Sequence, residues 1–137
     1  MKVVILGLSQ FGVQFARLMQ EAGHQITLID RNLNAFEQLP HAFPAQRVLG
    51  IGIDEDVQRK AGVDHADLFL AATDSDNTNL MAAQLAKVVF NIHRSVARVH
   101  DEDRADIFNG LGIIEVICPS LDGARRLAQS IAEKTNL

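Results

Sequence analysis

The stretch KVVILGLSQFG, residues 2–12, decides the fold class of this chain. Its first half is apolar without polar alternation, which is typical of a central parallel strand covered on both faces. Gly7 then allows a sharp turn, and Gly12 lets the following helix, expected over residues 10–21, pack closely on that strand. Such a turn directs the N–H groups of the helix N-terminus toward a phosphate. These features predict the first unit of a Rossmann-type fold.

A second strand is expected over residues 25–30 (QITLID), and it ends in Asp30, 18 residues after Gly12. This is close to the spacing of about 20 residues expected for the acid that binds the ribose hydroxyls of a dinucleotide. A carboxylate accepts from both hydroxyls and repels a 2′-phosphate, so Asp30 favours NAD or an adenine nucleotide over NADP. Arg31 follows directly and can weaken that preference.

Ser9 stands where the usual G-x-G-x-x-G pattern has its middle glycine. A side chain there crowds the place where backbone approaches a phosphate, although its hydroxyl could donate to a phosphate oxygen instead. A lone glycine pattern often serves packing alone. Here the pattern follows a strand, begins a helix and is joined by Asp30 at the expected spacing, so we favour nucleotide binding.

The rest of the chain alternates between short apolar runs and helical patterns. This alternation favours right-handed βαβ crossovers and an α/β fold with one doubly wound, parallel sheet of about six strands. No linker or low-complexity stretch interrupts the 137 residues, so one domain is expected. We expect further strands over 46–49, 67–72, 95–99 and 115–118, and further helices over 34–39, 54–61, 75–90, 102–109 and 120–134.

The amino-acid composition argues against several classes of function. Hydrophobic residues make up 47% of the chain and charged residues 22%, as in a globular protein. The net charge of −4 and the absence of a cluster of Lys and Arg argue against a nucleic-acid partner. The single cysteine, Cys118, cannot form an internal disulfide and suits a reducing cytoplasm. No apolar run approaches the roughly 20 residues of a membrane helix, so we expect a cytoplasmic protein.

Polar residues follow the third and fourth expected strands, where such folds bind their ligands. GIGID, residues 50–54, follows the third strand, and ATDSDNTN, residues 72–79, follows the fourth. Thr73 and Asp74 lie nearest the sheet edge and are the better candidates for ligand contact. Asp74, Ser75 and Asp76 can each cap the helix that follows, and for Asp76 capping is the favoured role.

Arg98 ends the fifth expected strand. A buried cation there needs a carboxylate or phosphate partner, and pairing with Asp74 or Asp76 is favoured slightly over direct ligand contact. No catalytic constellation is recognisable around these residues. The five histidines have no spacing suited to a metal, and no second domain supplies a substrate pocket beside a nicotinamide. We therefore expect a protein that is not an enzyme and binds no metal.

Four stretches of the chain resemble the N-terminal nucleotide-binding (RCK, or TrkA-N) domain of Trk/Ktr potassium-uptake regulators and RCK potassium channels. The second and third are more specific than the glycine turn, because they separate this family from ordinary dehydrogenases. The stretches are VVILGLSQFG (3–12) with LID (28–30), ATDSDNTNLMAAQLAK (72–87), ARVHDEDRADIFNGLG (97–112) and IIEVICPS (113–120).

The resemblance implies a regulatory domain that spans residues 1–137. In this family the domain forms homodimers and larger rings beneath a membrane potassium transporter or channel, at the inner face of the membrane. Binding of NAD(H), or of ATP and ADP, shifts the ring and so gates the pore. The nucleotide-binding residues implied by position are Gly7, Ser9, Gln10, Phe11, Gly12, Asp30, Arg31, Gly50, Ile51, Thr73, Asp74 and Arg98.

The same resemblance implies that the last helix, about residues 120–134, crosses to a partner subunit. Its apolar positions recur at helical spacing and suit such docking, although the same stripe would also suit packing on its own sheet. They are Leu121, Ala124, Leu127, Ala128 and Ile131.

Two departures from the family pattern keep alternatives open. Many relatives have glycine in place of Ser9, and a small residue with an aspartate near Ile51, which here offers no polar contact to a nucleotide. One alternative is therefore an assembly module that has lost nucleotide binding. The other is a small NAD-dependent oxidoreductase domain.

Overall fold

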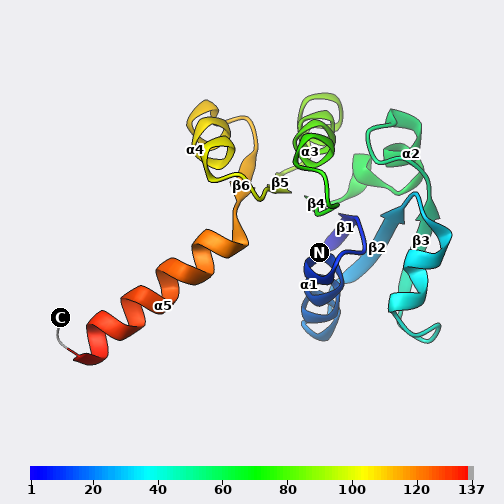
Figure 1. The fold of residues 1–137 in the computed structure, drawn as a ribbon. Coiled ribbons are helices and arrows are strands. Elements are labelled where there is room, and N and C mark those ends of the chain that lie inside the picture. Colours follow the sequence, from blue (N-terminus) through cyan, green and yellow to red (C-terminus); the bar gives the residue numbers. More distant parts are fainter. Residues whose placement is uncertain (136–137) are drawn as a thin grey trace.

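The computed structural model describes residues 1–135, which form a sheet of six parallel strands (Figure 1). The strand order is β3-β2-β1-β4-β5-β6, so the chain winds outward from β1 in both directions. This confirms the predicted doubly wound Rossmann-type sheet. The strands are β1 (Lys2–Leu6), β2 (Gln25–Asp30), β3 (Ala45–Leu49), β4 (Leu68–Ala71), β5 (Arg94–Arg98) and β6 (Glu115–Ile117).

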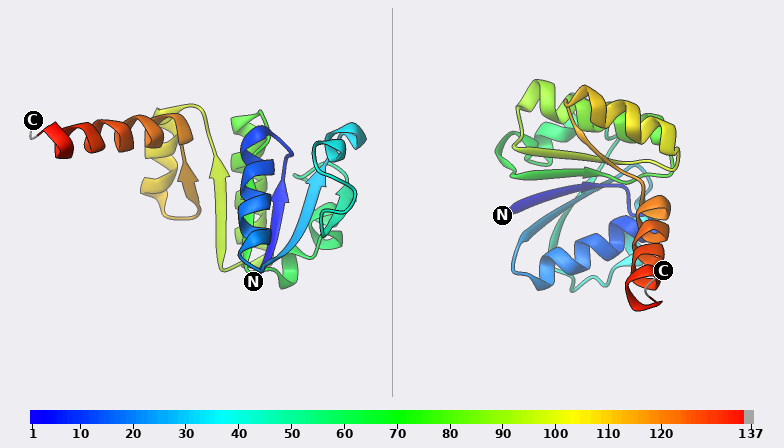
Figure 2. Two further views of the ribbon diagram at one scale, coloured as in Figure 1. Left: turned by 90° about the horizontal axis from the view of Figure 1, so that it is seen from below. Right: turned by 90° about the vertical axis from the view of Figure 1, so that its left-hand side faces the viewer.

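Helices cover both faces of the sheet (Figures 1 and 2). Helix α1 and the 3-10 helix η1 lie on one face, and α2, α3 and α4 lie on the other. A last helix, α5, leaves the body of the domain after β6. The bounds are α1 (Gln10–Glu21), η1 (Leu33–Gln38), α2 (Glu55–Lys60), η2 (Val63–His65), α3 (Asp76–Phe90), α4 (Glu102–Leu111) and α5 (Pro119–Thr135).

The sheet has a core on each face, and β1 contributes to both. Val4 and Leu6 pack in the core under α2, α3 and α4, whereas Val3 and Ile5 pack in the core under α1. All four are buried. Successive strand residues point to opposite faces, so a strand that is covered on both sides must be apolar throughout. This explains the uninterrupted run VVIL.

Two local predictions are corrected. The segment expected as a short helix over residues 34–39 is a 3-10 helix, which begins where the Asn32 side chain accepts from the N–H of Asn34. Of the three candidates for the cap of α3, Ser75 fills the position and the favoured Asp76 does not, because the Ser75 hydroxyl accepts from the N–H of Thr78 at 3.2 Å. The carboxylate of Asp76 instead accepts from the N–H groups that follow β5, 2.9 Å from His100 and 3.1 Å from Asp101.

Helix α5 projects away from the domain (Figures 1 and 2). Leu121, in its first turn, packs against the core, whereas Ala124, Leu127, Ala128 and Ile131 are exposed. The interpretation that this apolar stripe covers the domain's own sheet is therefore wrong. Within the described residues, no helix has the length and apolar character to cross a membrane.

Candidate functional site

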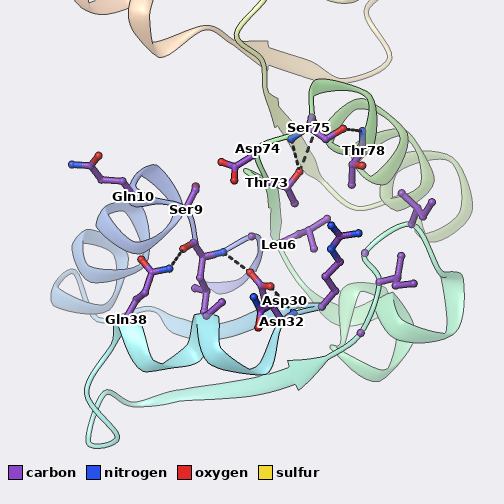
Figure 3. A pocket seen from close by; sticks show the side chains of 18 residues that line it. Leu6, Ser9, Gln10, Asp30, Asn32, Gln38, Thr73, Asp74, Ser75 and Thr78 are labelled. Carbon is purple, nitrogen blue, oxygen red and sulfur yellow. Dashed lines mark hydrogen bonds between the residues drawn. The ribbon is translucent and has the colours of Figure 1, made fainter.

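A cleft with a volume of about 900 Å³ opens at the carboxyl ends of the strands, where the chain reverses its winding direction between β1 and β4 (Figure 3). This is the place where open α/β sheets bind ligands. Its walls come from the turns after β1, β2, β3 and β4. The lining residues are Leu6, Gly7, Leu8, Ser9, Gln10, Asp30, Arg31, Asn32, Ala35, Gln38, Gly50, Ile51, Gly52, Ile53, Thr73, Asp74, Ser75 and Thr78.

The turn after β1 is built on two glycines. Gly7 has a φ of +95°, and a Cβ there would stand 2.6 Å from the backbone nitrogen of Thr73. Only glycine allows this turn to lie so close to the end of β4. A Cβ on Gly12 would collide with the carbonyl oxygen of Gly7. The two glycines therefore hold the N-terminus of α1 directly against the carboxyl end of β1.

The Ser9 hydroxyl is committed within the protein. It donates to the carbonyl oxygen of Ala72 at 2.6 Å and accepts from the N–H of Gly12 at 3.2 Å, as the N-cap of α1. Its hydrogen is therefore not directed at a phosphate, unlike the role considered from sequence. No described residue accepts from the backbone N–H groups of Ser9, Gln10 and Phe11. These three donors make the helix N-terminus suited to an anion.

Asp30 joins the ends of β1 and β2. One carboxylate oxygen accepts from the N–H of Leu8 at 3.0 Å, and the other accepts from the N–H of Asn32 at 2.9 Å (Figure 3). Each carboxylate oxygen has a further lone pair, and the half-buried side chain lines the cleft. Asp30 therefore holds the glycine turn after β1 and also presents acceptors suited to ribose hydroxyls.

The loop after β3 forms an apolar wall of the cleft through Ile51 and Ile53, which are both exposed. Gln58 of α2 holds this loop in place from behind. Its side-chain amide is buried and donates to the carbonyl oxygens of Gly52 at 2.8 Å and Ala82 at 3.0 Å, while its Oε1 has no partner in the described chain. Gln58 was not among the predicted site residues. In the sequence, this role is indicated only by a polar residue on the inner face of a short helix.

Asn79 fixes the loop after β4. Its side-chain oxygen accepts from the N–H and the hydroxyl of Thr73, at 2.8 and 2.6 Å. Its side-chain nitrogen donates to the carbonyl oxygens of Thr73 at 2.9 Å and Arg98 at 2.8 Å. One buried amide thus joins the carboxyl ends of β4 and β5. Asn79 belongs to the family motif at residues 72–87 but was not among the predicted nucleotide-binding residues.

Arg98 pairs with backbone oxygens rather than with a buried carboxylate. Its Nη2 donates to the carbonyl oxygen of Thr73 at 2.7 Å and more weakly to that of Ala72 at 3.4 Å. The expected partner Asp74 lies 3.9 Å away and is fully exposed, and Asp76 contacts the loop after β5 instead. The guanidinium carbon of Arg98 lies 5.8 Å from the centre of the Phe11 ring.

The structure divides the predicted binding residues between two cavities. Nine of them line the cleft, while Phe11 and Arg98 line a second cavity of about 320 Å³ beside it, and Gly12 is buried beneath the turn. Gln10 lines both cavities. The nine in the cleft are Gly7, Ser9, Gln10, Asp30, Arg31, Gly50, Ile51, Thr73 and Asp74.

The carboxylate and histidine side chains of the described residues form no cluster suited to a metal. No group of three or more His, Cys, Asp or Glu side chains among the described residues could hold a metal ion. The cleft is also lined by Leu8, Asn32 and Gln38, which were not predicted. They reach it through turn geometry that the sequence pattern does not specify.

Comparison with known proteins agrees with this architecture. Residues 3–119 match the family model of the TrkA-N domain. The chain is 37% identical over 113 residues to the Trk system potassium uptake protein TrkA of Streptomyces coelicolor, an alignment that covers 82% of this chain and 51% of that protein. The chain thus spans about half the length of this relative.

Two solved structures share the fold. The Kef C-terminal domain of Shewanella denitrificans in its AMP-bound form has a TM-score of 0.79 at 22% identity, covering all of this chain and 83% of that one. The GsuK channel bound to NAD has a TM-score of 0.77 at 24% identity, covering 98% of this chain and 24% of that one. With the family model matching most of its length, this chain belongs to the TrkA-N domain family.

Proposed function

We propose that residues 1–137 form a regulatory domain that binds an adenine nucleotide, either NAD(H) or ATP and ADP, and thereby gates a membrane potassium transporter or channel. The observation that carries the proposal is the pairing of two features in one cleft. Three unpartnered N–H groups at Ser9, Gln10 and Phe11 suit a phosphate, and the Asp30 carboxylate beside them suits a ribose.

The cleft fits an adenosine phosphate part by part. The N-terminus of α1 would hold the phosphate, and Asp30 would hold the ribose hydroxyls. Ile51 and Ile53 offer an apolar wall against which an adenine ring would pack. Arg31, Gly50, Thr73 and Asp74 complete the cleft around these groups.

The related structures support the same ligand class. The Kef domain was solved with AMP and the GsuK channel with NAD, and both ligands contain an adenosine phosphate. The TrkA relative is a component of a potassium uptake system, which supports a potassium transporter or channel as the partner. We place the chain in the cytoplasm, at the inner face of the membrane through that partner, with no role for nucleic acid.

The proposed role is a switch without turnover. A nucleotide changes the state of such a switch only when it binds one of two conformations more tightly than the other. We assign the subunit contact to the exposed stripe of α5, which would dock on a second copy to form a homodimer and then a larger ring. Leu127 lies at the centre of this stripe.

Thermal unfolding with NAD, NADH, ATP, ADP and NADP tests the nucleotide site. We expect stabilisation of about 2.7 kcal/mol at a hundredfold excess of the preferred nucleotide over its Kd. Asp30→Ala should abolish the shift, whereas Asp106→Ala, which removes an exposed carboxylate on α4, should preserve it.

Three outcomes would contradict the proposal. Unchanged unfolding with all five nucleotides would favour an assembly module that does not bind them. Turnover of NADH or NAD with a substrate would identify an oxidoreductase domain. Full binding by Asp30→Ala would place the nucleotide elsewhere.

A further inference from the structure

We propose that Gln38 is a positioning residue, one that directs the N–H of Ser9 toward the phosphate of a bound nucleotide. This role rests on the proposed nucleotide site. Gln38 is the last residue of η1 and lies in the wall of the cleft. Its side-chain amide donates to the carbonyl oxygen of Leu8 at 2.7 Å, so it joins η1 to the glycine turn after β1 (Figure 3).

The Leu8 carbonyl and the Ser9 N–H belong to the same peptide unit. The peptide bonds among the described residues are trans, so these two groups point in opposite directions. By holding the carbonyl, Gln38 therefore also fixes the direction of the Ser9 N–H. No described residue accepts from this N–H, which is the first of the three donors at the start of α1 that suit a phosphate. Without Gln38, the peptide unit would be free to turn this donor away from the ligand.

The peptide unit on the other side of Leu8 is fixed by a different side chain. The N–H of Leu8 donates to a carboxylate oxygen of Asp30 at 3.0 Å. The Leu8 side chain between the two units is only 2% exposed, and it packs in the core under α1. Asp30 from the end of β2 and Gln38 from the end of η1 thus hold the turn from both sides. Asp30 is also the proposed ribose ligand, so a change at Gln38 disturbs the turn while that ligand stays in place.

The reach of Gln38 to Leu8 depends on how η1 is anchored, because Gln38 itself is exposed. Just before η1, the N–H of Asn32 donates to the second carboxylate oxygen of Asp30 at 2.9 Å. Directly after η1, Leu39 is 3% exposed and belongs to the core under α1. Both ends of the segment are therefore fixed. A closed set of hydrogen bonds and backbone runs from Leu8 through Asp30 and η1 to Gln38 and back to Leu8.

Gln38→Met tests this role, because methionine has a similar length but cannot donate to the Leu8 carbonyl. NMR titration of the full chain with AMP and with adenosine separates the phosphate from the nucleoside. We expect the AMP affinity of Gln38→Met to fall about fivefold, the effect of one neutral hydrogen bond, while its adenosine affinity stays within about twofold of wild type. The matched control is Gln46→Met, at an exposed position of β3 outside the cleft lining, which should leave both affinities unchanged.

A second measurement needs no nucleotide. The nitrogen resonance of the Ser9 amide is sensitive to a hydrogen bond at the Leu8 carbonyl, because the two groups share one conjugated peptide unit. Hydrogen exchange of the Leu8 N–H measures how often the turn opens. In the ligand-free chain, Gln38→Met should shift the Ser9 resonance and speed the exchange of the Leu8 N–H about fivefold. Gln46→Met should change neither.

Three results would overturn the proposal. Equal AMP affinities in Gln38→Met and Gln46→Met would show that the contact to Leu8 does not affect the phosphate. A parallel loss of AMP and adenosine affinity would show that Gln38 contacts the nucleoside. A lower AMP affinity with an unchanged Ser9 resonance would show that Gln38 contacts the phosphate directly.

Failure of the proposed nucleotide site is recognised separately. If the wild-type chain binds neither AMP nor adenosine, the proposed function is wrong. The ligand-free Ser9 resonance and Leu8 exchange then decide alone whether Gln38 orients the Ser9 N–H: a shift with faster exchange in Gln38→Met supports that role, and spectra equal to those of Gln46→Met refute it.

Discussion

The carboxylate of Asp30 accepts a hydrogen bond from the backbone N–H of Leu8 at 3.0 Å. The acid at the end of β2 therefore positions the turn after β1 that we propose to bind phosphate, in addition to offering acceptors to a ribose. Substitutions of Asp30 will change both the stability of the turn and the affinity for nucleotide, and two variants are needed to separate these effects.

Asp30→Asn should retain part of the stability and lose affinity. The amide oxygen can still accept from Leu8, but the amide nitrogen cannot accept from the N–H of Asn32 and the negative charge is gone, so AMP affinity should fall at least tenfold. Asp30→Ala leaves the N–H groups of both Leu8 and Asn32 without this partner and should lower the free energy of unfolding further, by about 1–3 kcal/mol. Calorimetry and urea unfolding measure the two effects. Equal stability of Asp30→Ala and wild type would show that the contact to Leu8 is unimportant.

Gly7 and Gly23 form a matched pair of glycines with positive φ, at +95° and +92°. A Cβ on Gly23 meets nothing within 4 Å, so Gly23→Ala should cost about 1 kcal/mol from backbone strain alone. A Cβ on Gly7 would meet the backbone of Thr73, so Gly7→Ala should cost about 3 kcal/mol or more. Urea unfolding compares them. Similar losses in both variants would contradict the close approach of the turn to β4.

Ser9→Ala should lower stability without lowering nucleotide affinity. The hydroxyl caps α1 and donates to Ala72, so its loss should cost about 1 kcal/mol of unfolding free energy. AMP affinity should stay within about twofold of wild type, because the N–H of Gly12 is freed and the other donors remain. A tenfold loss of AMP affinity in a stable Ser9→Ala variant would show that the hydroxyl contacts the phosphate.

Gln58→Met should weaken AMP binding even though Gln58 does not line the cleft. It removes the donor to the carbonyl oxygen of Gly52 and so releases the loop that carries Ile51 and Ile53. We expect a loss of about 1–3 kcal/mol in stability and a measurable loss of AMP affinity. Gln84→Met is the control, because Gln84 donates only to Leu80 within its own helix. Matching AMP affinities in the two variants would contradict a positioning role for Gln58.

Leu127→Glu should convert the proposed dimer into monomers on a sizing column, because it places a charge at the centre of the apolar stripe of α5. Gln129→Glu introduces the same side chain about 200° around the helix and should leave the dimer intact. A Leu127→Glu variant that elutes with the wild-type dimer would show that the subunits meet elsewhere.

The sequence was sufficient to predict the succession of strands and helices along the chain, because their patterns are local. Residues 3–6 and 68–71 are apolar throughout since both faces of each strand are covered, and glycine follows the strand or helix where the chain must turn. The 3-10 helix at residues 33–38 was mistaken for a short helix of ordinary geometry. Six residues are too few for hydrophobic spacing to separate the two.

The position of a site residue could be predicted from the sequence only where its role depends on its place in a turn. The position of Asp30 at the cleft, for example, follows from the spacing of the strands and the glycine turn. The partner of Arg98 does not, because the available acceptors include the carbonyl oxygens of Ala72 and Thr73 at the end of the neighbouring strand as well as the carboxylates of Asp74 and Asp76. Asn79 and Gln58 were missed for a related reason. Their burial depends on packing between α2, α3 and the strand ends, and no single segment encodes it.

The attachment of α5 has a mechanical consequence. A helix of 17 residues is about 25 Å long, and this one is anchored to the domain near its first turn, at Leu121. A small rotation at its base would therefore move its far end much further. A rotation of about 10° at Pro119 displaces the far end of the helix by roughly 4 Å. A displacement of a few tenths of an ångström in the residues around the cavity at its base would thus become several times larger at the far end of the helix, where the proposed partner subunit would contact it.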